Sequence, residues 1–80
     1  MNATAEIPLS FVPAGSEVVI KNIVGGAGVH RKLCGMGFGK DTKLTVLRND
    51  QGRMLVAIGE SRFALGFGIA QKVIVEHLDQ

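Results

Sequence analysis

The amino-acid sequence predicts a mainly β protein: a small antiparallel β-barrel of about five strands, with one short α-helix between the first two core strands. Short runs rich in β-branched residues alternate with glycine-containing turns, as short strands joined by tight connections do. Closure of the sheet is favoured because it hides strand edges that so few strands would otherwise expose. The longest stretch that does not alternate like a strand, residues 25–42, is the expected place of the helix.

Composition is that of one globular domain of 80 residues, 46% hydrophobic and 20% charged. This is enough apolar surface to offset the entropy of ordering the chain. A single cysteine excludes an internal disulfide and a cluster of several cysteines on a metal, and it fits a reducing compartment. No basic leader and no long apolar run is seen, so we expect a cytoplasmic protein. We expect residues 1–7 to be a flexible N-terminal lead and residues 8–80 to be a single domain.

The first core strand is expected at residues 17–24, which are rich in valine and isoleucine. A short apolar stretch at residues 8–12 comes before it. Pro13 and Gly15 mark a turn between the two, because proline fixes φ and glycine permits a positive φ. Glycines in residues 25–28 end the strand.

The helix is predicted from Val29, Leu33 and Met36, which stand at i, i+4 and i+7 and therefore share one helical face. We expect about two to three turns. Gly37 is placed to be the left-handed residue just past the helix end, and Phe38 can then fold back on Leu33.

The second half of the chain predicts further short strands. In chain order they lie at residues 42–48, 54–58, 62–65 and 72–78. Residues 49–52 form a hairpin turn by composition, with Gly52 at the positive-φ position. Residues 66–71 are too short and rich in glycine for a full helix, so we expect a single helical or 3₁₀ turn there.

The order and spacing of these segments resemble the FeoA family, small partners in bacterial ferrous iron uptake. The helix of that family reads Arg-x-Leu-x-x-Met/Leu-Gly-Leu and is followed by Pro-Gly-Thr. Leu33, Met36, Gly37 and Thr42 fit this pattern, and Phe38 stands where leucine is usual. Residues 59–75 look like the family's Gly-x-x-Arg-x-Ala-Leu…Ala-x-x-Ile-x-Val ending.

The resemblance covers residues 8–78 and has two departures. Residues 39–41 replace the usual Pro-Gly turn, and Gly66 with Phe67 replaces a commoner charged pair. The resemblance implies an SH3-like β-barrel, a cytoplasmic location, and a membrane ferrous-iron transporter of the FeoB type, with its GTPase domain, as partner.

Residues 35–42 resemble a phosphate-binding loop in composition but not in register. A Walker A motif needs glycine, four residues, Gly-Lys, and then serine or threonine. Counting back from Gly39 and Lys40 places Cys34 at the first glycine, and Asp41 stands where the hydroxyl should be. A carboxylate at that place would repel phosphates, so we expect a helix cap and a turn instead.

His30 and Cys34 are the weak candidates for a metal site, because residues at i and i+4 meet on one helix face. Two ligands are too few for a stable site, and others would have to come from Glu76, His77 and Asp79, from the N-terminus or from another chain. We therefore expect no cofactor, with weak Fe²⁺ or Zn²⁺ binding as the alternative. Catalysis by Cys34 is not expected either, since no residue is clearly placed to orient His30 as a base.

Apolar residues of the helix and of the second half outnumber what so small a barrel can bury. A helix beside a barrel leaves a groove, and such grooves accept hydrophobic segments of partner proteins. Core packing and docking compete for the same side chains. The candidate partner-binding residues are Leu33, Met36, Phe38, Arg62 and Phe67.

The function expected from these observations is that of a protein-interaction module and not of an enzyme. By its resemblance to FeoA, it modulates a FeoB-type transporter in ferrous iron uptake. One alternative is a metal-responsive regulatory module, because SH3-like domains also occur attached to iron-dependent repressors. The other is a small-barrel nucleic-acid binder, although the net charge of +2 is scattered along the chain and few aromatics accompany it.

Overall fold

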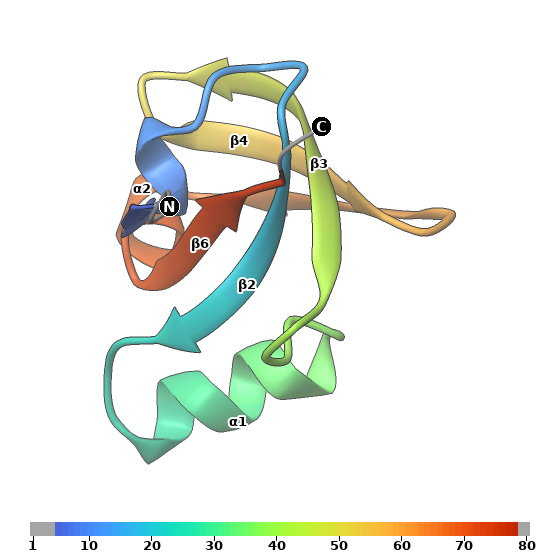
Figure 1. The fold of residues 1–80 in the computed structure, drawn as a ribbon. Helices are drawn as coiled ribbons and strands as arrows, with labels where there is room; N and C mark the ends of the chain where they lie inside the picture. The colour runs from blue at the N-terminus through green and yellow to red at the C-terminus, as the bar shows by residue number, and fades with distance from the viewer. Residues whose placement is uncertain (1–4, 79–80) are drawn as a thin grey trace.

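The structure is a computed structural model that describes residues 5–78 (Figure 1). Its elements are β1 (Glu6–Pro8), η1 (Leu9–Phe11), β2 (Glu17–Ile23), α1 (Ala27–Gly35), β3 (Lys43–Asp50), β4 (Arg53–Ile58), β5 (Ser61–Leu65), α2 (Phe67–Ala70) and β6 (Val73–His77). The six strands form one antiparallel sheet in the order β1-β6-β2-β3-β4-β5. The predicted mainly β fold, with its helix between the first two core strands, is confirmed.

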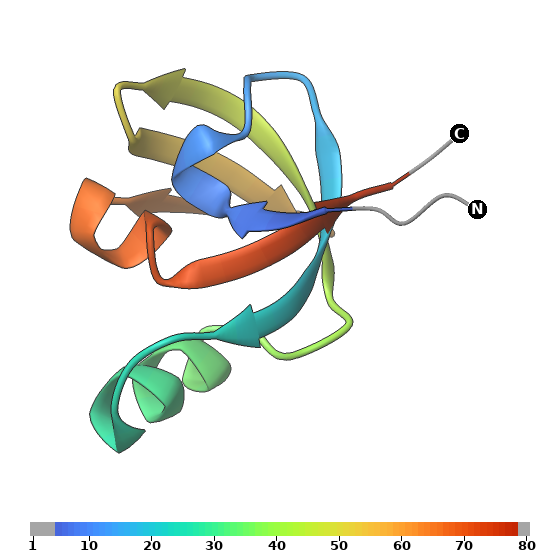
Figure 2. The same ribbon diagram turned by 60° about the vertical axis from the view of Figure 1, so that its left-hand side comes forward.

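The sheet curves round on itself in both views, and α1 lies to one side of it (Figures 1 and 2). Closure is not reached, because no ladder joins the two outer strands of the described residues, β1 and β5. η1 and α2 lie side by side against the same curved sheet (Figures 1 and 2).

The strand beyond the expected five is β1, which corrects the prediction for the N-terminal lead. Ile7 pairs with Val75 of β6, and the half-buried Ile7 side chain packs against the core. Glu6 and Ile7 are therefore part of the sheet, although residues 1–7 are expected to be a flexible lead. So short a strand has little pattern of its own and is held by its partner strand. Residues 1–4 lie outside the described part of the chain.

The core lies on the concave face of the sheet. Buried residues recur at every second position along most of the strands, as the two-residue period of a strand requires, and the bulge in β2 breaks this period after Ile20. Its strand members are Val18, Ile20, Ile23, Leu44, Val46, Met54, Val56, Leu65, Val73 and Val75. Leu9 and Val12 from the η1 segment and Ala70 from α2 are fully buried against them.

The β3–β4 hairpin turn lies within the predicted residues 49–52 but is shorter, because Asn49 and Asp50 belong to β3. Asp50 pairs with Arg53, and the two residues between them, Gln51 and Gly52, have φ values of 56° and 93°. Positive φ at both central residues is the geometry of a type I′ turn, whose twist matches that of the flanking strands. The left-handed role expected for Gly52 is confirmed.

Asn49 ties this hairpin to the N-terminal segment. Its Nδ2 donates to the carbonyl oxygens of Ser10 at 3.1 Å and Val12 at 2.8 Å, and its Oδ1 accepts from the Gly52 N–H at 2.8 Å. One side chain therefore makes hydrogen bonds to three backbone groups, two in the distant N-terminal segment and one in the tight turn. These contacts hold η1 over the end of the sheet.

Asn49→Ala is expected to lower the free energy of unfolding by about 2 kcal/mol, because it leaves three partly buried backbone groups without their partner. Urea unfolding followed by circular dichroism measures the loss. Asn22→Ala is the matched control, since the Asn22 side chain is seen to bond only the neighbouring Ile23 N–H among the described residues. Equal losses in the two variants would show that the Asn49 contacts do not hold η1.

Candidate functional site

The C-terminal end of α1 has the predicted glycine cap. Gly37 has a φ of 96°. The Phe38 N–H donates to the Leu33 carbonyl at 2.9 Å, and the Gly37 N–H donates to the Cys34 carbonyl at 3.0 Å. These two bonds form a Schellman motif, in which the residue after the glycine folds back on the last helical turn. The cap aims Phe38 at the sheet.

Phe38 is part of the core, and this burial excludes it from the docking surface. Its side chain is 0% exposed and meets Phe63 of β5 edge to face, with ring centroids 5.2 Å apart. Leu33 is 1% exposed. Both side chains are therefore buried in the core: Leu33 is the buried residue of α1, and Phe38 follows the helix cap and packs on Phe63.

A groove does lie between α1 and the edge of the sheet, as expected. We call it the helix–sheet groove; it has a volume of about 210 Å³. It is lined by Lys32, Leu33, Met36, Ala64, Leu65, Gly66 and Ile69. Met36 and Ile69 are the half-buried apolar side chains that remain available in it, and Leu33 forms part of its floor.

Arg62 and Phe67, the other two candidates, lie outside the lining of this groove. Arg62 is exposed on β5. Phe67 is 51% exposed, and its ring covers the hairpin turn, since a Cβ at Gly52 would come within 2.2 Å of its Cδ1 atom. Of the five predicted partner-binding residues, the structure brings only Leu33 and Met36 together in the groove.

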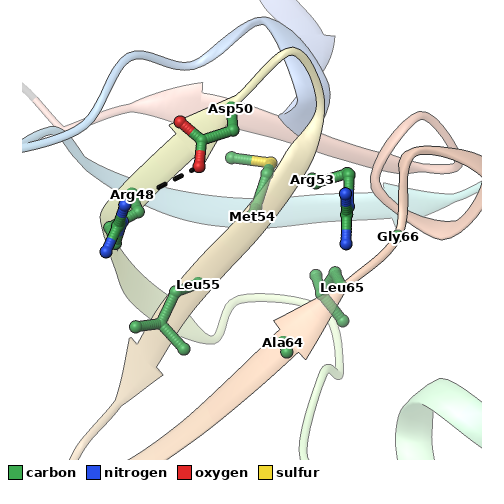
Figure 3. A pocket seen from close by; sticks show the side chains of 8 residues that line it. All are labelled: Arg48, Asp50, Arg53, Met54, Leu55, Ala64, Leu65 and Gly66. Atoms are coloured by element: carbon green, nitrogen blue, oxygen red, sulfur yellow. Dashed lines mark ion pairs between the residues drawn. The ribbon is translucent and has the colours of Figure 1, made fainter.

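A second pocket lies on the outer face of the sheet across β3, β4 and β5 (Figure 3). We call it the outer-face pocket; its volume is about 420 Å³, and Arg48, Asp50, Arg53, Met54, Leu55, Ala64, Leu65 and Gly66 line it. Figure 3 shows Arg48 and Arg53 on opposite sides, with Leu55 and Ala64 below and between them. Arg48 Nη2 lies 3.8 Å from Asp50 Oδ2, and both side chains are more than two-thirds exposed at 71% and 74%.

Sequence reasoning did not identify the outer-face pocket. Arg48 pairs with Leu55, which in turn pairs with Ala64. The two-residue turn sets the first of these pairings, so Arg48 beside Leu55 could have been found by counting back from Gly52. The second pairing is set in the same way by the two-residue turn of Gly59 and Glu60, because Ile58 pairs with Ser61. Ile69 of the groove was missed because the glycines around it hide any period.

The weak metal candidates do meet in one pocket. His30 and Cys34, both exposed, line a hollow of about 240 Å³ between α1 and β2. Lys21 and Lys40 line it as well, and their ammonium groups would repel a cation. Over residues 5–78, no group of three or more His, Cys, Asp and Glu side chains is placed to hold a metal ion. Asp79 lies outside the described residues.

The phosphate-loop segment forms a cap and a turn. Asp41 has a φ of 69°, its N–H donates to the Ile20 carbonyl at 2.7 Å, and its Oδ1 lies 3.8 Å from Lys21 Nζ. Asp41 thus adopts the left-handed conformation in the turn where the family pattern has Pro-Gly, a conformation that aspartate tolerates better than most residues. Its carboxylate is mostly exposed, at 72%, so this ion pair adds little stability.

No helix within residues 5–78 has the length and apolar character needed to span a membrane.

Comparison with known proteins gives a consistent result. Residues 7–77 match the family model described as the FeoA domain. A protein of Methanocaldococcus jannaschii described as an Fe(2+) transport protein A is 39% identical over 69 residues, which are 86% of this chain and 84% of that protein.

The solved structures agree in fold. A crystal structure of an iron uptake regulatory protein (FeoA) superposes with a TM-score of 0.86 at 33% identity, over 92% of this chain and 100% of that one. A manganese-dependent transcriptional repressor in complex with manganese also gives 0.86, at 23% identity, over 96% of this chain and 39% of the repressor. This second likeness is one of fold alone.

Proposed function

Because this chain belongs to the FeoA family, whose model matches residues 7–77, we propose that it serves ferrous iron transport by binding another protein. Family membership supports the role in iron transport itself. The partner we propose is a FeoB-type membrane transporter, bound at its cytoplasmic GTPase domain, and the effect is to modulate transport. The chain acts in the cytoplasm, without catalysis and without a cofactor of its own.

The observation that carries this proposal is the helix–sheet groove. It presents the half-buried Met36 and Ile69 side chains beside the exposed Ala64 and Lys32. Grooves of this kind, apolar at the base and charged at the rim, bind apolar side chains of other proteins. Since Leu33 and Phe38 are in the core, the contact surface consists of Met36, Ile69 and the end of β5.

We expect Met36→Asp to weaken binding to the GTPase domain about tenfold or more, because a carboxylate would be buried in the apolar groove. Val24→Asp is the matched control: Val24 is a 52% exposed apolar residue that lies outside the groove. It should change affinity by less than about twofold. Isothermal titration calorimetry with the purified domain measures both, and circular dichroism checks that each variant is folded.

The possible outcomes test the identity of the partner and the position of the contact surface separately. Absence of binding by the wild-type chain would contradict the transporter as partner. Equal binding by wild type and by folded Met36→Asp would contradict the groove as the contact surface. Met36→Leu should bind like wild type, since it keeps the apolar volume.

A metal-responsive regulatory module is the second candidate, although the likeness to manganese-dependent repressors supports the fold and not the metal binding. Such a module would need ligands for the metal, and His30 with Cys34 are the pair that shares a pocket. Titration with Fe²⁺ or Zn²⁺ of the wild type and of a His30→Ala, Cys34→Ala variant tests it. Binding that the double substitution abolishes would support this candidate. Binding that survives would remove both ligands.

A further inference from the structure

β5 is an edge strand with a free backbone side. Ser61–Leu65 pairs with β4 along its whole length and stands last in the sheet order. None of the backbone hydrogen bonds that the described residues make outside their helices and strand pairs involves these five positions. An edge of this kind presents alternate N–H and C=O groups to which another extended chain can bond.

Two pockets flank this edge, one on each face of the sheet. Ala64, Leu65 and Gly66 line both the helix–sheet groove and the outer-face pocket, so the end of β5 is the wall between them. Along β5, Phe63 and Leu65 are turned inward and buried or half-buried, whereas Arg62 and Ala64 are exposed. A strand added beside β5 would follow the same alternation, with successive side chains directed to the groove and to the outer face.

The two sides differ in chemistry. The groove offers Met36, Leu65 and Ile69. The outer face carries Arg48 and Arg53, and only Asp50 among the pocket residues opposes them. Exposed Arg62 adds a third guanidinium next to Ala64 on the same strand. Apolar side chains on one side and acidic side chains on the other complement this pair of surfaces.

We propose that β5 is the docking edge for an extended segment of the partner protein, which pairs with Ser61–Leu65 as an added strand. Its apolar side chains enter the helix–sheet groove, and its alternate acidic side chains meet Arg48, Arg53 and Arg62. The inference rests on the proposed function, because it states how the partner is held.

The observations favour this edge and this occupant over others. The opposite edge, β1, has three residues and includes Pro8, which has no N–H to donate. None of the three pockets described above is lined by a residue of β1. Pairing of β5 with β5 of a second copy would bring the arginines of both chains together, which like-charge repulsion opposes. An acidic, alternating segment avoids this repulsion.

Two sets of probes test the inference. The first is a capped peptide of about seven residues that alternates Glu and Leu, long enough to span the five residues of β5. The second is a series of overlapping peptides that cover the transporter's GTPase domain. Each binding peptide is also made with single N-methyl groups, which remove one donor at a time. We expect methylation at alternate residues to weaken binding about tenfold, and methylation at the residues between to have less than about a twofold effect.

Amide hydrogen exchange supplies a readout on the protein itself. Bound peptide should slow exchange at alternate amides of Ser61–Leu65 that exchange quickly in the free chain. Arg53→Glu should weaken binding of the Glu–Leu peptide about tenfold. The same variant should bind a Lys–Leu peptide more tightly than the wild type does. Arg31→Glu is the matched charge control, since Arg31 is exposed on α1 and lines neither pocket.

Each outcome decides one question. If the GTPase domain binds but no N-methyl pattern, no β5 protection and no Arg53→Glu effect is seen, strand addition is wrong and the proposed function stands. If the domain does not bind while the Glu–Leu peptide shows the alternating pattern, the proposed partner is wrong and the β5 edge stands. Protection of β5 that rises with protein concentration, without peptide, would show that a second copy occupies the edge and would overturn the inference.

Discussion

Phe38→Ala is expected to lower the free energy of unfolding by about 3–5 kcal/mol, the usual loss for removal of a fully buried phenylalanine. The Phe38 ring is 0% exposed and packs edge to face on Phe63. The substitution therefore removes buried area, opens a cavity and breaks the aromatic pair. Urea unfolding measures the change.

The matched control is Phe11→Ala, since Phe11 is 71% exposed. It should change stability by no more than about 0.5 kcal/mol, as most surface substitutions do. If the wild-type chain is not stable enough for Phe38→Ala to stay folded, Phe38→Leu can be measured instead. It keeps most of the side-chain volume and should still lower the free energy of unfolding by about 1 kcal/mol. Equal effects at Phe38 and Phe11 would contradict the core position of Phe38.

Gly52→Ala is expected to lower the free energy of unfolding by about 2–5 kcal/mol, from two causes that act together. A left-handed backbone costs a residue with a Cβ about 1–2 kcal/mol, and Gly52 has a φ of 93°. The new Cβ would also come within 2.2 Å of Phe67 Cδ1, and overpacking of this kind costs about 1–3 kcal/mol.

Two variants separate these causes. Gly59 also has a positive φ, 59°, but a Cβ there would meet nothing within 4 Å, so Gly59→Ala reports the backbone cost alone. Gly52→Ala in a Phe67→Ala background should lose about 1–2 kcal/mol, because the ring is gone and the backbone cost remains. If removal of the ring leaves the cost of Gly52→Ala unchanged, Phe67 does not hold its place over the turn.

Much of the fold could be predicted because its signals are local. The alternation of buried and exposed residues in the strands, the glycine after the helix and the turn residues before Gly52 each depend on a few neighbours in sequence. The same local patterns carry the resemblance to the FeoA family, which the match over residues 7–77 bears out. β1 could not be predicted in this way, since three residues hold too little pattern and their place depends on β6.

The candidate site was predicted only in part. A groove beside the helix follows from placing a helix next to a sheet, and Met36 follows from the helical period. The sequence predicts that the cap folds Phe38 back on Leu33. It does not predict that Phe38 is buried in the core, because this depends on the contact with Phe63, twenty-five positions further on. The arginines of the outer-face pocket needed the alignment of three strands.

By itself, the sequence determines the strand and helix segments, the left-handed turns at Gly37 and Gly52, and the family, because each of these depends on short-range steric and hydrophobic patterns. Only the tertiary structure decides which apolar side chains are buried in the core and which stay available to bind a partner. The reason is that residues from distant segments fill the space inside so small a sheet. It also decides that β5 ends the sheet between two pockets, since strand order is a long-range property.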